Sequence, residues 1–446
     1  MNSTPHDPLL NDPHLNDSQL NDSQLNDSQL NDLMAYLDSS PSPWHATASA
    51  IRRLEAAGFH AMNATDQLVD VPAKGYVRRG AALVAWHRGS QAGPMAPLHI
   101  VGAHTDSPCL KVKPHADAGG YGWKQLAVEV YGGALLNSWL DRDLGVAGRI
   151  ELRDGWTTVA VTGPIARVPQ LAIHLDRDVN ERGVTLDKQA HMAPVWGVGT
   201  ASDGEFRDWL AGEACVSAAD VVGWDLCLFD VTVAAVLGAD SSLLASGRLD
   251  NQASCWAATA ALCTAGDPGA ATSVIALFDH EEVGSESVSG AAGPLLEHVL
   301  ERLALAHGAD RSQYLAQLAS SSCISADNAH SVHPNYPERH EAGHRPLVNQ
   351  GPAIKLNSNQ RYATSAASAA MLQRVFESAG VPWQVFVSRN NMPCGSTIGP
   401  ITATRLGIDT VDVGIPQLSM HSARELCGTQ DPPWLTQGLK AYFEGF

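Results

Sequence analysis

The sequence predicts an α/β fold, namely an α/β/α sandwich interrupted by an inserted β-rich domain. After residue 246, helical and strand-like segments alternate, which is typical of a sheet covered by helices on both faces. Between residues 109 and 242 the segments are mostly strand-like, as in LAVEVYGG, TTVAVTG and LFDVTVAAV. A chain of 446 residues is also longer than one typical domain, so two domains are expected.

The globular chain is expected to begin near Leu33. The first 26 residues from there predict a short helix, a Pro-Ser break and an amphipathic helix that ends at Gly58. Strand-like runs follow at residues 68–71, 81–86 and 98–101. Beyond the insertion, the pattern predicts helices over 250–266, 295–308 and 361–380 and strands over 272–279, 383–388 and 409–414. The sandwich is therefore expected to be split in sequence, into residues 33–108 and 243–446, around an insertion at 109–242.

A five-residue repeat precedes this region. From Leu10 to Asp32 the unit Leu-Asn-Asp-Ser-Gln recurs, with one Pro-His variant. Leucines five residues apart match neither the helical period of 3.6 nor the strand period of 2, so they form no continuous apolar face. Residues 1–32 are accordingly predicted to be a disordered, low-complexity tail.

Composition argues against nucleic acid and membrane partners. The chain carries 47 acidic and 29 basic residues, a formal net charge of -18, which repels phosphate backbones and anionic lipids. No stretch reaches the roughly 18 apolar residues of a spanning helix, and the N-terminus lacks the pattern of a signal peptide. The eight cysteines form no CxxC pair, which favours reduced thiols. A soluble, cytoplasmic protein is expected.

Acids and histidines stand where predicted strands end. His104 follows the apolar run 98–101, and Asp106 lies two residues on, on the same side if the chain stays extended, where it can orient the imidazole. Asp250 stands where a loop meets a helix, a position from which one carboxylate can reach two metal ions. Other acids and a histidine follow further strand-like segments; they are Glu281, Glu282, Asp327 and His421. Side chains beyond the carboxyl ends of strands converge on one crevice in open α/β sheets, so a common site is expected.

These residue types indicate a catalytic metal site. Imidazole and carboxylate ligands suit zinc, with manganese or cobalt as substitutes, and the absence of thiolates argues against a closed structural zinc site. Each residue also has a plainer interpretation. His104 alone is more often a core or surface histidine, and Asp250 can be a helix N-cap. The adjacent Glu281 and Glu282 are harder to dismiss, because two carboxylates beside a buried strand repel each other unless a cation or proton compensates.

Two other motifs in the sequence are candidates for a functional site. HEAGH, from His340 to His344, matches the zinc motif HExxH, but it contains Gly343 and lies between two prolines, so a polar loop is expected instead. NNMPCGSTIGP can present backbone amides to an anion or form a tight structural turn, and the sequence does not decide between them. No GxSxG elbow, Walker A loop or GxGxxG fingerprint is present.

Seven ordered blocks resemble the M18 family of metallo-aminopeptidases, specifically aspartyl aminopeptidase. They are GAHTDSP, RLDNQASC, FDHEEVGSESVSGA, SADNAHSVHPNY, KLNSNQRYAT, PCGSTIGPI and PQLSMHSARE. The resemblance runs from about Leu33 to the end of the chain and implies an aminopeptidase that releases N-terminal Asp or Glu from peptides with a free N-terminus.

The resemblance also implies a role for each site residue. His104 and Asp327 would hold one metal ion, Glu282 and His421 the other, and Asp250 would bridge them. Glu281 would be the general base. His330, Lys355 and Tyr362 would contact substrate within the subunit, and His174 of the inserted domain would reach the active site of a neighbouring subunit. The inserted domain would mediate dimerisation, and dimers would assemble into a dodecamer.

Three alternatives stay open at this point. The same ligand set suits a dinuclear deacylase or carboxypeptidase, or an aminopeptidase with another N-terminal preference. A mainly structural, cargo-like assembly is a further alternative, against which a complete set of ligands and base argues. Lys355 is the candidate cation for an acidic substrate side chain, and a surface lysine at a strand end is its plainer interpretation.

Overall fold

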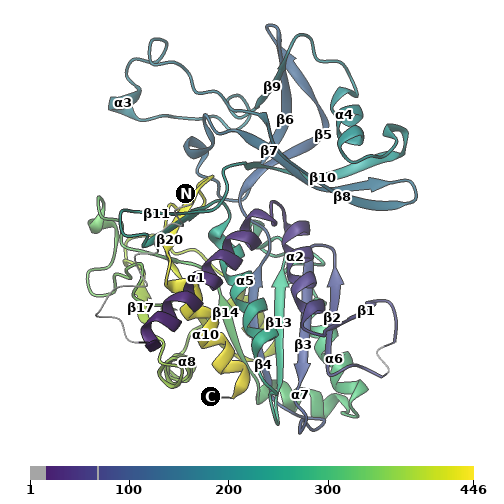
Figure 1. Ribbon diagram of the computed structural model, residues 1–446, viewed down its shortest axis with the longest axis vertical. Coiled ribbons are helices and arrows are strands. Elements are labelled where there is room, and N and C mark those ends of the chain that lie inside the picture. Colours follow the sequence, from purple (N-terminus) through teal and green to yellow (C-terminus); the bar gives the residue numbers. More distant parts are fainter. Residues whose placement is uncertain (1–16, 68–69, 446) are drawn as a thin grey trace, which may run out of the picture.

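A computed structural model describes residues 17–67 and 70–445 and confirms the predicted α/β fold. The larger body contains a nine-stranded sheet, and the smaller one, above it in Figure 1, contains a six-stranded sheet. The order of the large sheet is β1 (His60–Met62), β2 (Lys74–Arg79), β3 (Ala82–Arg88), β13 (Thr272–Phe278), β4 (Leu98–His104), β14 (Ser322–Ala326), β18 (Asp409–Gly414), β16 (Ala353–Leu356) and β17 (Gln384–Val387). Strand β4, from before the insertion, therefore lies between β13 and β14, which come after it in sequence.

Helices cover both faces of the large sheet, as a sandwich requires. Strand β13 shows why: Ile275 and Leu277 pack into the core on one face, and Val274 and Ala276 pack into the core on the other. The first face is covered by α1 (Asp17–Asp38), α2 (Pro43–Ala56), α5 (Leu249–Thr264), α8 (Ala366–Ser378) and α10 (Asp431–Glu444). The second is covered by α6 (Leu295–Ala306), α7 (Arg311–Ala319) and α9 (Ile398–Leu406). Buried on both faces, β13 reads as a continuous apolar run.

The inserted sheet is antiparallel and has its own core. Its order is β8 (Gly155–Ala166), β7 (Leu144–Leu152), β10 (Val221–Asp230), β5 (Cys109–Gly120), β6 (Trp123–Tyr131) and β9 (Val195–Val198). Two helices, α3 (Val179–Arg182) and α4 (Glu205–Glu213), and two single turns, η2 (Leu136–Trp139) and η3 (Ala218–Asp220), lie between these strands in sequence. Phe206 and Leu210 of α4 pack into this core.

A third, five-stranded sheet corrects the expected end of the insertion at residue 242. It contains β11 (Ala235–Leu237), β12 (Leu243–Ser246), β20 (Glu425–Gly428), β19 (Pro416–Leu418) and β15 (Ala329–His330). Strand β11 pairs with β12 rather than with the inserted sheet, whose last strand ends at Asp230. Periodicity in sequence cannot detect strands of two to four residues drawn from such distant segments.

The expected boundary of the tail at residue 32 is also corrected, because helix α1 runs from Asp17 to Asp38. Leu30 lies three and seven residues before Leu33 and Leu37, so the last repeat joins an apolar stripe, and all three leucines are buried. The Asp32 carboxylate accepts a hydrogen bond of 2.7 Å from Trp256 Nε1 and pairs with Arg53 at 2.8 Å. The part of the repeat within residues 1–16 lies outside the described residues.

Within the described ranges, no helix has the length and apolar character needed to cross a bilayer. All eight cysteines are free thiols.

Candidate metal centre

The predicted metal ligands gather at one edge of the large sheet. Strands β13, β4, β14 and β18 are mutually parallel, so their carboxyl ends share that edge. His104 is the last residue of β4, and Asp327 directly follows β14. Glu281 and Glu282 lie in the turn η4 (Glu281–Val283), just after β13. Two further segments complete the cluster: Asp250 stands at the start of α5, and His421 lies between β19 and β20.

Asp250 lies between two groups of potential ligands. Its Oδ1 is 3.4 Å from His104 Nε2, and its Oδ2 is 3.4 Å from His421 Nε2. On the first side, His104 Nε2 is 3.8 Å from Asp327 Oδ1. On the second side, His421 Nε2 is 3.4 Å from Glu282 Oε2. The cluster thus contains two three-residue groups that share Asp250, each with its ligand atoms within 4.8 Å of one another.

The spacing of these atoms fits divalent metal ions. Ligands about 2.0 to 2.2 Å from a tetrahedral zinc ion stand about 3.3 to 3.6 Å apart, close to the 3.4 Å that separates Asp250 from each histidine. Direct hydrogen bonds between such groups would be shorter. Asp250 Oδ1 and Glu282 Oε1 are buried and have no hydrogen-bond partner among the described residues, an arrangement that is costly unless a cation satisfies them. The donor set therefore suits divalent metal ions.

The electrostatics of the cluster lead to the same conclusion. Burial raises the pKa of Glu281 to about 7; the His104 imidazole opposes this rise, and the carboxylates of Asp327 and Asp250 add to it. Burial and the Asp250 charge likewise raise the pKa of Glu282. Burial also acts to raise the pKa of Asp250, but His104 and His421 outweigh it, so this pKa is lowered. Several carboxylates packed into a buried site repel one another, and bound cations would stabilise them.

Asp106 supports both the histidine and the glutamate pair. His104 Nδ1 is 3.0 Å from the Asp106 backbone oxygen and 3.4 Å from its Oδ1, as expected for a residue that orients the imidazole. The same carboxylate accepts hydrogen bonds of 3.1 Å from the backbone N–H groups of Glu281 and Glu282. The sequence did not indicate this second contact, because residue 106 and the glutamates are far apart in the chain.

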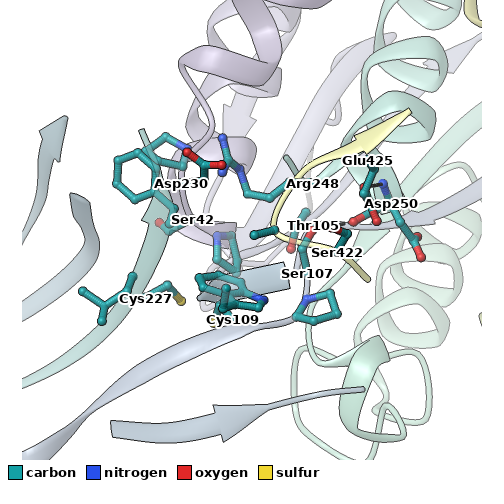
Figure 2. A pocket seen from close by; sticks show the side chains of 17 residues that line it. Ser42, Thr105, Ser107, Cys109, Cys227, Asp230, Arg248, Asp250, Ser422 and Glu425 are labelled. Atoms are coloured by element: carbon teal, nitrogen blue, oxygen red, sulfur yellow. Dashed lines mark hydrogen bonds between the residues drawn. The ribbon is translucent and has the colours of Figure 1, made fainter. Parts of the chain in front are cut away.

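Glu425 is a site residue that the sequence analysis missed. Its Oε2 accepts a 2.9 Å hydrogen bond from the backbone N–H of Asp250, and its Oε1 accepts a 2.7 Å bond from that of His421. Figure 2 shows Glu425 next to Asp250 on the wall of a pocket that also includes Cys109 and Cys227 of the inserted sheet. Burial, together with the Asp250 charge, raises the pKa of Glu425 to about 8. In the sequence, Glu425 could have been noticed from its position four residues after His421 in the block PQLSMHSARE.

Three of the four predicted substrate contacts lie near the cluster. Lys355 in β16 is only 1% exposed, and its Nζ is 3.3 Å from Asp327 Oδ2 and 3.2 Å from the backbone oxygen of Asn328. This ammonium also lies 4.9 Å from the ring centroid of Tyr362. His330 is exposed, and its ring is edge-on to Phe386, which also contacts Tyr362. Lys355 is therefore a buried lysine paired with Asp327, rather than a surface charge.

The fourth residue, His174, lies elsewhere. It is exposed in the loop between β8 and α3 of the inserted domain, and no hydrogen bond or ion pair joins it to the described residues of the cluster in the same chain. The flanking side chains Leu171, Ile173 and Leu175 are exposed as well. A role for His174 thus depends on a second copy of the chain.

The two remaining motifs form loops. HEAGH follows the short turn η5 (Pro337–Arg339) and is not helical, and His344 Nδ1 lies 2.6 Å from Glu341 Oε2. Its histidines therefore do not share a helical face, as the flanking prolines indicated. Residues 390–396 of NNMPCGSTIGP form a loop that leads to the N-cap of α9, and the last three residues of the motif begin that helix. At the N-cap, Thr397 Oγ1 accepts a 3.2 Å bond from Gly399 N.

Known proteins have similar sequences and the same fold. A family model described as aminopeptidase I zinc metalloprotease, M18, matches residues 36–443. A Streptomyces coelicolor protein named probable M18 family aminopeptidase 2 is 51% identical over 417 residues, which cover 92% of this chain and 96% of the relative. A Mycobacterium leprae protein of the same name is 47% identical over 418 residues, with 92% and 97% covered.

Solved structures agree with this assignment. A chain in the cryo-electron microscopy structure of the Ape4 and Nbr1 complex is 33% identical, with a TM-score of 0.91 over 95% of this chain and 86% of that one. The mApe1 dodecamer of S. cerevisiae gives 27% identity and a TM-score of 0.82, over 94% and 97%. By its sequence and its fold, the chain belongs to the M18 family of zinc metallopeptidases and is an aminopeptidase.

Proposed function

We propose that this aminopeptidase binds two divalent metal ions and releases N-terminal Asp or Glu from peptides. His104 and Asp327 would hold one ion, Glu282 and His421 would hold the other, and Asp250 would be shared by both. The observation that carries this proposal is the pair of three-residue groups that share Asp250. Zinc is the first candidate for both ions, with manganese or cobalt as substitutes.

Glu281 is the proposed general base. Its Oε2 lies 3.9 Å from His104 Nε2, and Glu281 forms a third group of potential ligands with His104 and Glu282, one that does not include Asp250. The Glu281 side chain is 16% exposed and the Glu282 side chain 4%, so Glu281 is the more accessible of the two glutamates. Metal ions held by these residues would supply a polarised scissile carbonyl and a more acidic attacking water. Glu281 takes a proton from that water and passes it to the leaving amine nitrogen.

Tyr362 and His330 are further proposed substrate contacts, and both rings contact Phe386. Burial and the Cys394 thiol raise the pKa of the Tyr362 phenol, so it stays protonated and can donate a hydrogen bond at neutral pH. A donor at this position can stabilise negative charge on the carbonyl oxygen during attack. The exposed His330 ring packs edge-on against Phe386, which also contacts Tyr362.

Lys355 supports the preference for an acidic first residue. An ammonium has three N–H donors, and those of Lys355 contact Asp327 Oδ2 and the Asn328 backbone oxygen, which leaves one for a substrate carboxylate. The competing proposal is the same chemistry with another N-terminal preference, in which Lys355 acts only by holding Asp327.

A peptide panel that varies only the first residue tests this function. We expect cleavage of peptides that begin with Asp or Glu, little cleavage of their N-acetylated forms, loss of activity with a chelator, and recovery with zinc, manganese or cobalt. The Lys355→Met variant should lower kcat/KM for Glu-first peptides about tenfold more than for Ala-first peptides, because it removes a charge-assisted hydrogen bond. An equal loss for both peptides would contradict the role in specificity, and activity that survives exhaustive chelation would contradict the metal dependence.

Assembly is a further part of the proposal. The inserted domain dimerises, and its His174 enters the active site of a neighbouring copy; the exposed Leu171, Ile173 and Leu175 beside it support a contact there. One structural relative, S. cerevisiae mApe1, is a dodecamer, and the proposal extends that assembly to this chain. Co-expressing His174→Ala with Glu281→Gln should restore part of the activity that each variant lacks, and no restoration would count against a shared site. The free cysteines support a cytoplasmic location.

A further inference from the structure

The inserted domain reaches the metal centre through the end of its first hairpin. Strand β5 begins at Cys109, shortly after His104 and Asp106, and β6 returns to the same place at Tyr131. Tyr131 is paired with Cys109 across the two strands. The ring of Tyr131 is also held by Lys111, whose Nζ lies 4.3 Å from the ring centroid. This end of the hairpin is therefore fixed beside the catalytic edge of the large sheet.

The Tyr131 hydroxyl contacts the residue that holds the glutamate pair. It donates a hydrogen bond of 2.7 Å to Asp106 Oδ2. The same oxygen accepts the backbone N–H of Glu282 at 3.1 Å, whereas Asp106 Oδ1 accepts that of Glu281 at 3.1 Å and lies 3.4 Å from His104 Nδ1. Asp106 is fully buried, so its oxygens depend on these donors. Tyr131 acts on the oxygen that faces Glu282.

The residues after Tyr131 contact the ligands of the same group. A Cβ on Gly132 would lie 3.1 Å from Glu282 Cβ, and the backbone there has a φ of +71°, which favours glycine. A Cβ on Gly133 would lie 3.1 Å from His421 Nδ1, and the Gly133 backbone oxygen is 3.2 Å from that nitrogen. Leu135 N donates a 3.0 Å bond to the backbone oxygen of His421. One short segment of the inserted domain thus borders both Glu282 and His421.

We propose that Tyr131 is a positioning residue of the metal centre, which fixes Asp106 Oδ2 and thereby the backbone of Glu282 in the group formed by Asp250, Glu282 and His421. The inserted domain is in this way part of the active site of its own chain. The inference rests on the proposed role of Glu282 as a ligand. Tyr131 itself would contact neither substrate nor metal.

The Tyr131→Phe variant tests this role, because it removes one hydroxyl and keeps the ring. Removing a hydrogen-bond partner that orients a metal ligand typically lowers metal affinity or activity by about 10- to 100-fold. We expect one of the two ions to bind about 10- to 100-fold more weakly in titrations against a chromophoric chelator, while the other keeps its affinity. At limiting zinc, kcat should fall by a similar factor with KM within about threefold. Tyr121→Phe is the matched control, since Tyr121 is fully exposed at the other end of the same hairpin.

Three results would overturn the proposal. The first is that Tyr131→Phe binds both ions as the wild type does, and the second is that both ions weaken equally, as general destabilisation would cause. If Tyr131→Phe does not fold, Gly133→Ala replaces it, because its new Cβ would lie 3.1 Å from Nδ1 and 3.5 Å from Cε1 of the His421 ring. That variant should also lose affinity for one ion, and unchanged binding of both ions is the third contrary result. The proposed role of Glu281 is tested independently of Tyr131. Full activity of the Glu281→Gln variant would refute the general base but would not change the metal affinities expected for Tyr131→Phe.

Discussion

Replacing Glu281 with Gln is expected to lower kcat by a factor of about 10² to 10⁴ while both metal ions stay bound. Gln keeps the shape of the side chain but cannot accept the proton of the attacking water. The backbone N–H of residue 281 would still donate to Asp106 Oδ1, so the turn should keep its conformation. Steady-state kinetics, together with metal analysis by mass spectrometry, measures both quantities on one sample.

The neighbouring glutamate provides the control for this experiment. Glu282→Gln alters a carboxylate that faces His421 Nε2 at 3.4 Å, and it should weaken one metal ion. The two variants are thus expected to differ in metal content although their positions are adjacent. A Glu281→Gln enzyme with near wild-type kcat, or one that has lost an ion, would contradict the division of roles.

Replacing Asp250 with Asn is expected to have an equally large effect by a different route. The Asp250 carboxylate belongs both to the group with His104 and Asp327 and to the group with Glu282 and His421, and Asn offers one neutral oxygen in its place. Metal ions contribute several kcal/mol of charge stabilisation, so activity should fall by about 10³-fold or more, and both ions should bind more weakly. Activity and metal content should therefore be lost together.

Asp154 supplies a matched control for that substitution. It is an exposed aspartate in the turn between β7 and β8, and Asp154→Asn should leave activity and metal content unchanged. An Asp250→Asn enzyme that keeps one ion at full affinity would contradict the bridging role, because that ion would then be held by the other ligands alone.

The clustering of these acids and histidines could be predicted because several of them follow buried strands. His104 and Asp327 come directly at the ends of β4 and β14, where an apolar run in sequence stops at a polar residue. The parallel arrangement of those strands then brings residues more than 200 positions apart to one edge of the sheet. Interpreting the proline-flanked HEAGH segment as a loop also followed from local chemistry.

The residues that support the ligands could not be found in this way. Glu425 and Tyr131 act through hydrogen bonds to atoms far away in sequence, namely the Asp250 backbone and the Asp106 carboxylate. Neither residue stands out locally, since Tyr131 ends an ordinary strand of alternating burial. The pairing of Lys355 with Asp327 is of the same kind, because it depends on the antiparallel pairing of β16 with β18, which no local pattern encodes.

Crystals grown with zinc would test the central claim most directly. Anomalous difference maps at the zinc edge should show two peaks in each chain. One peak should contact His104 and Asp327, the other Glu282 and His421, and the Asp250 carboxylate should lie between them. A single peak, or two peaks that do not share Asp250, would contradict the proposed two-metal centre.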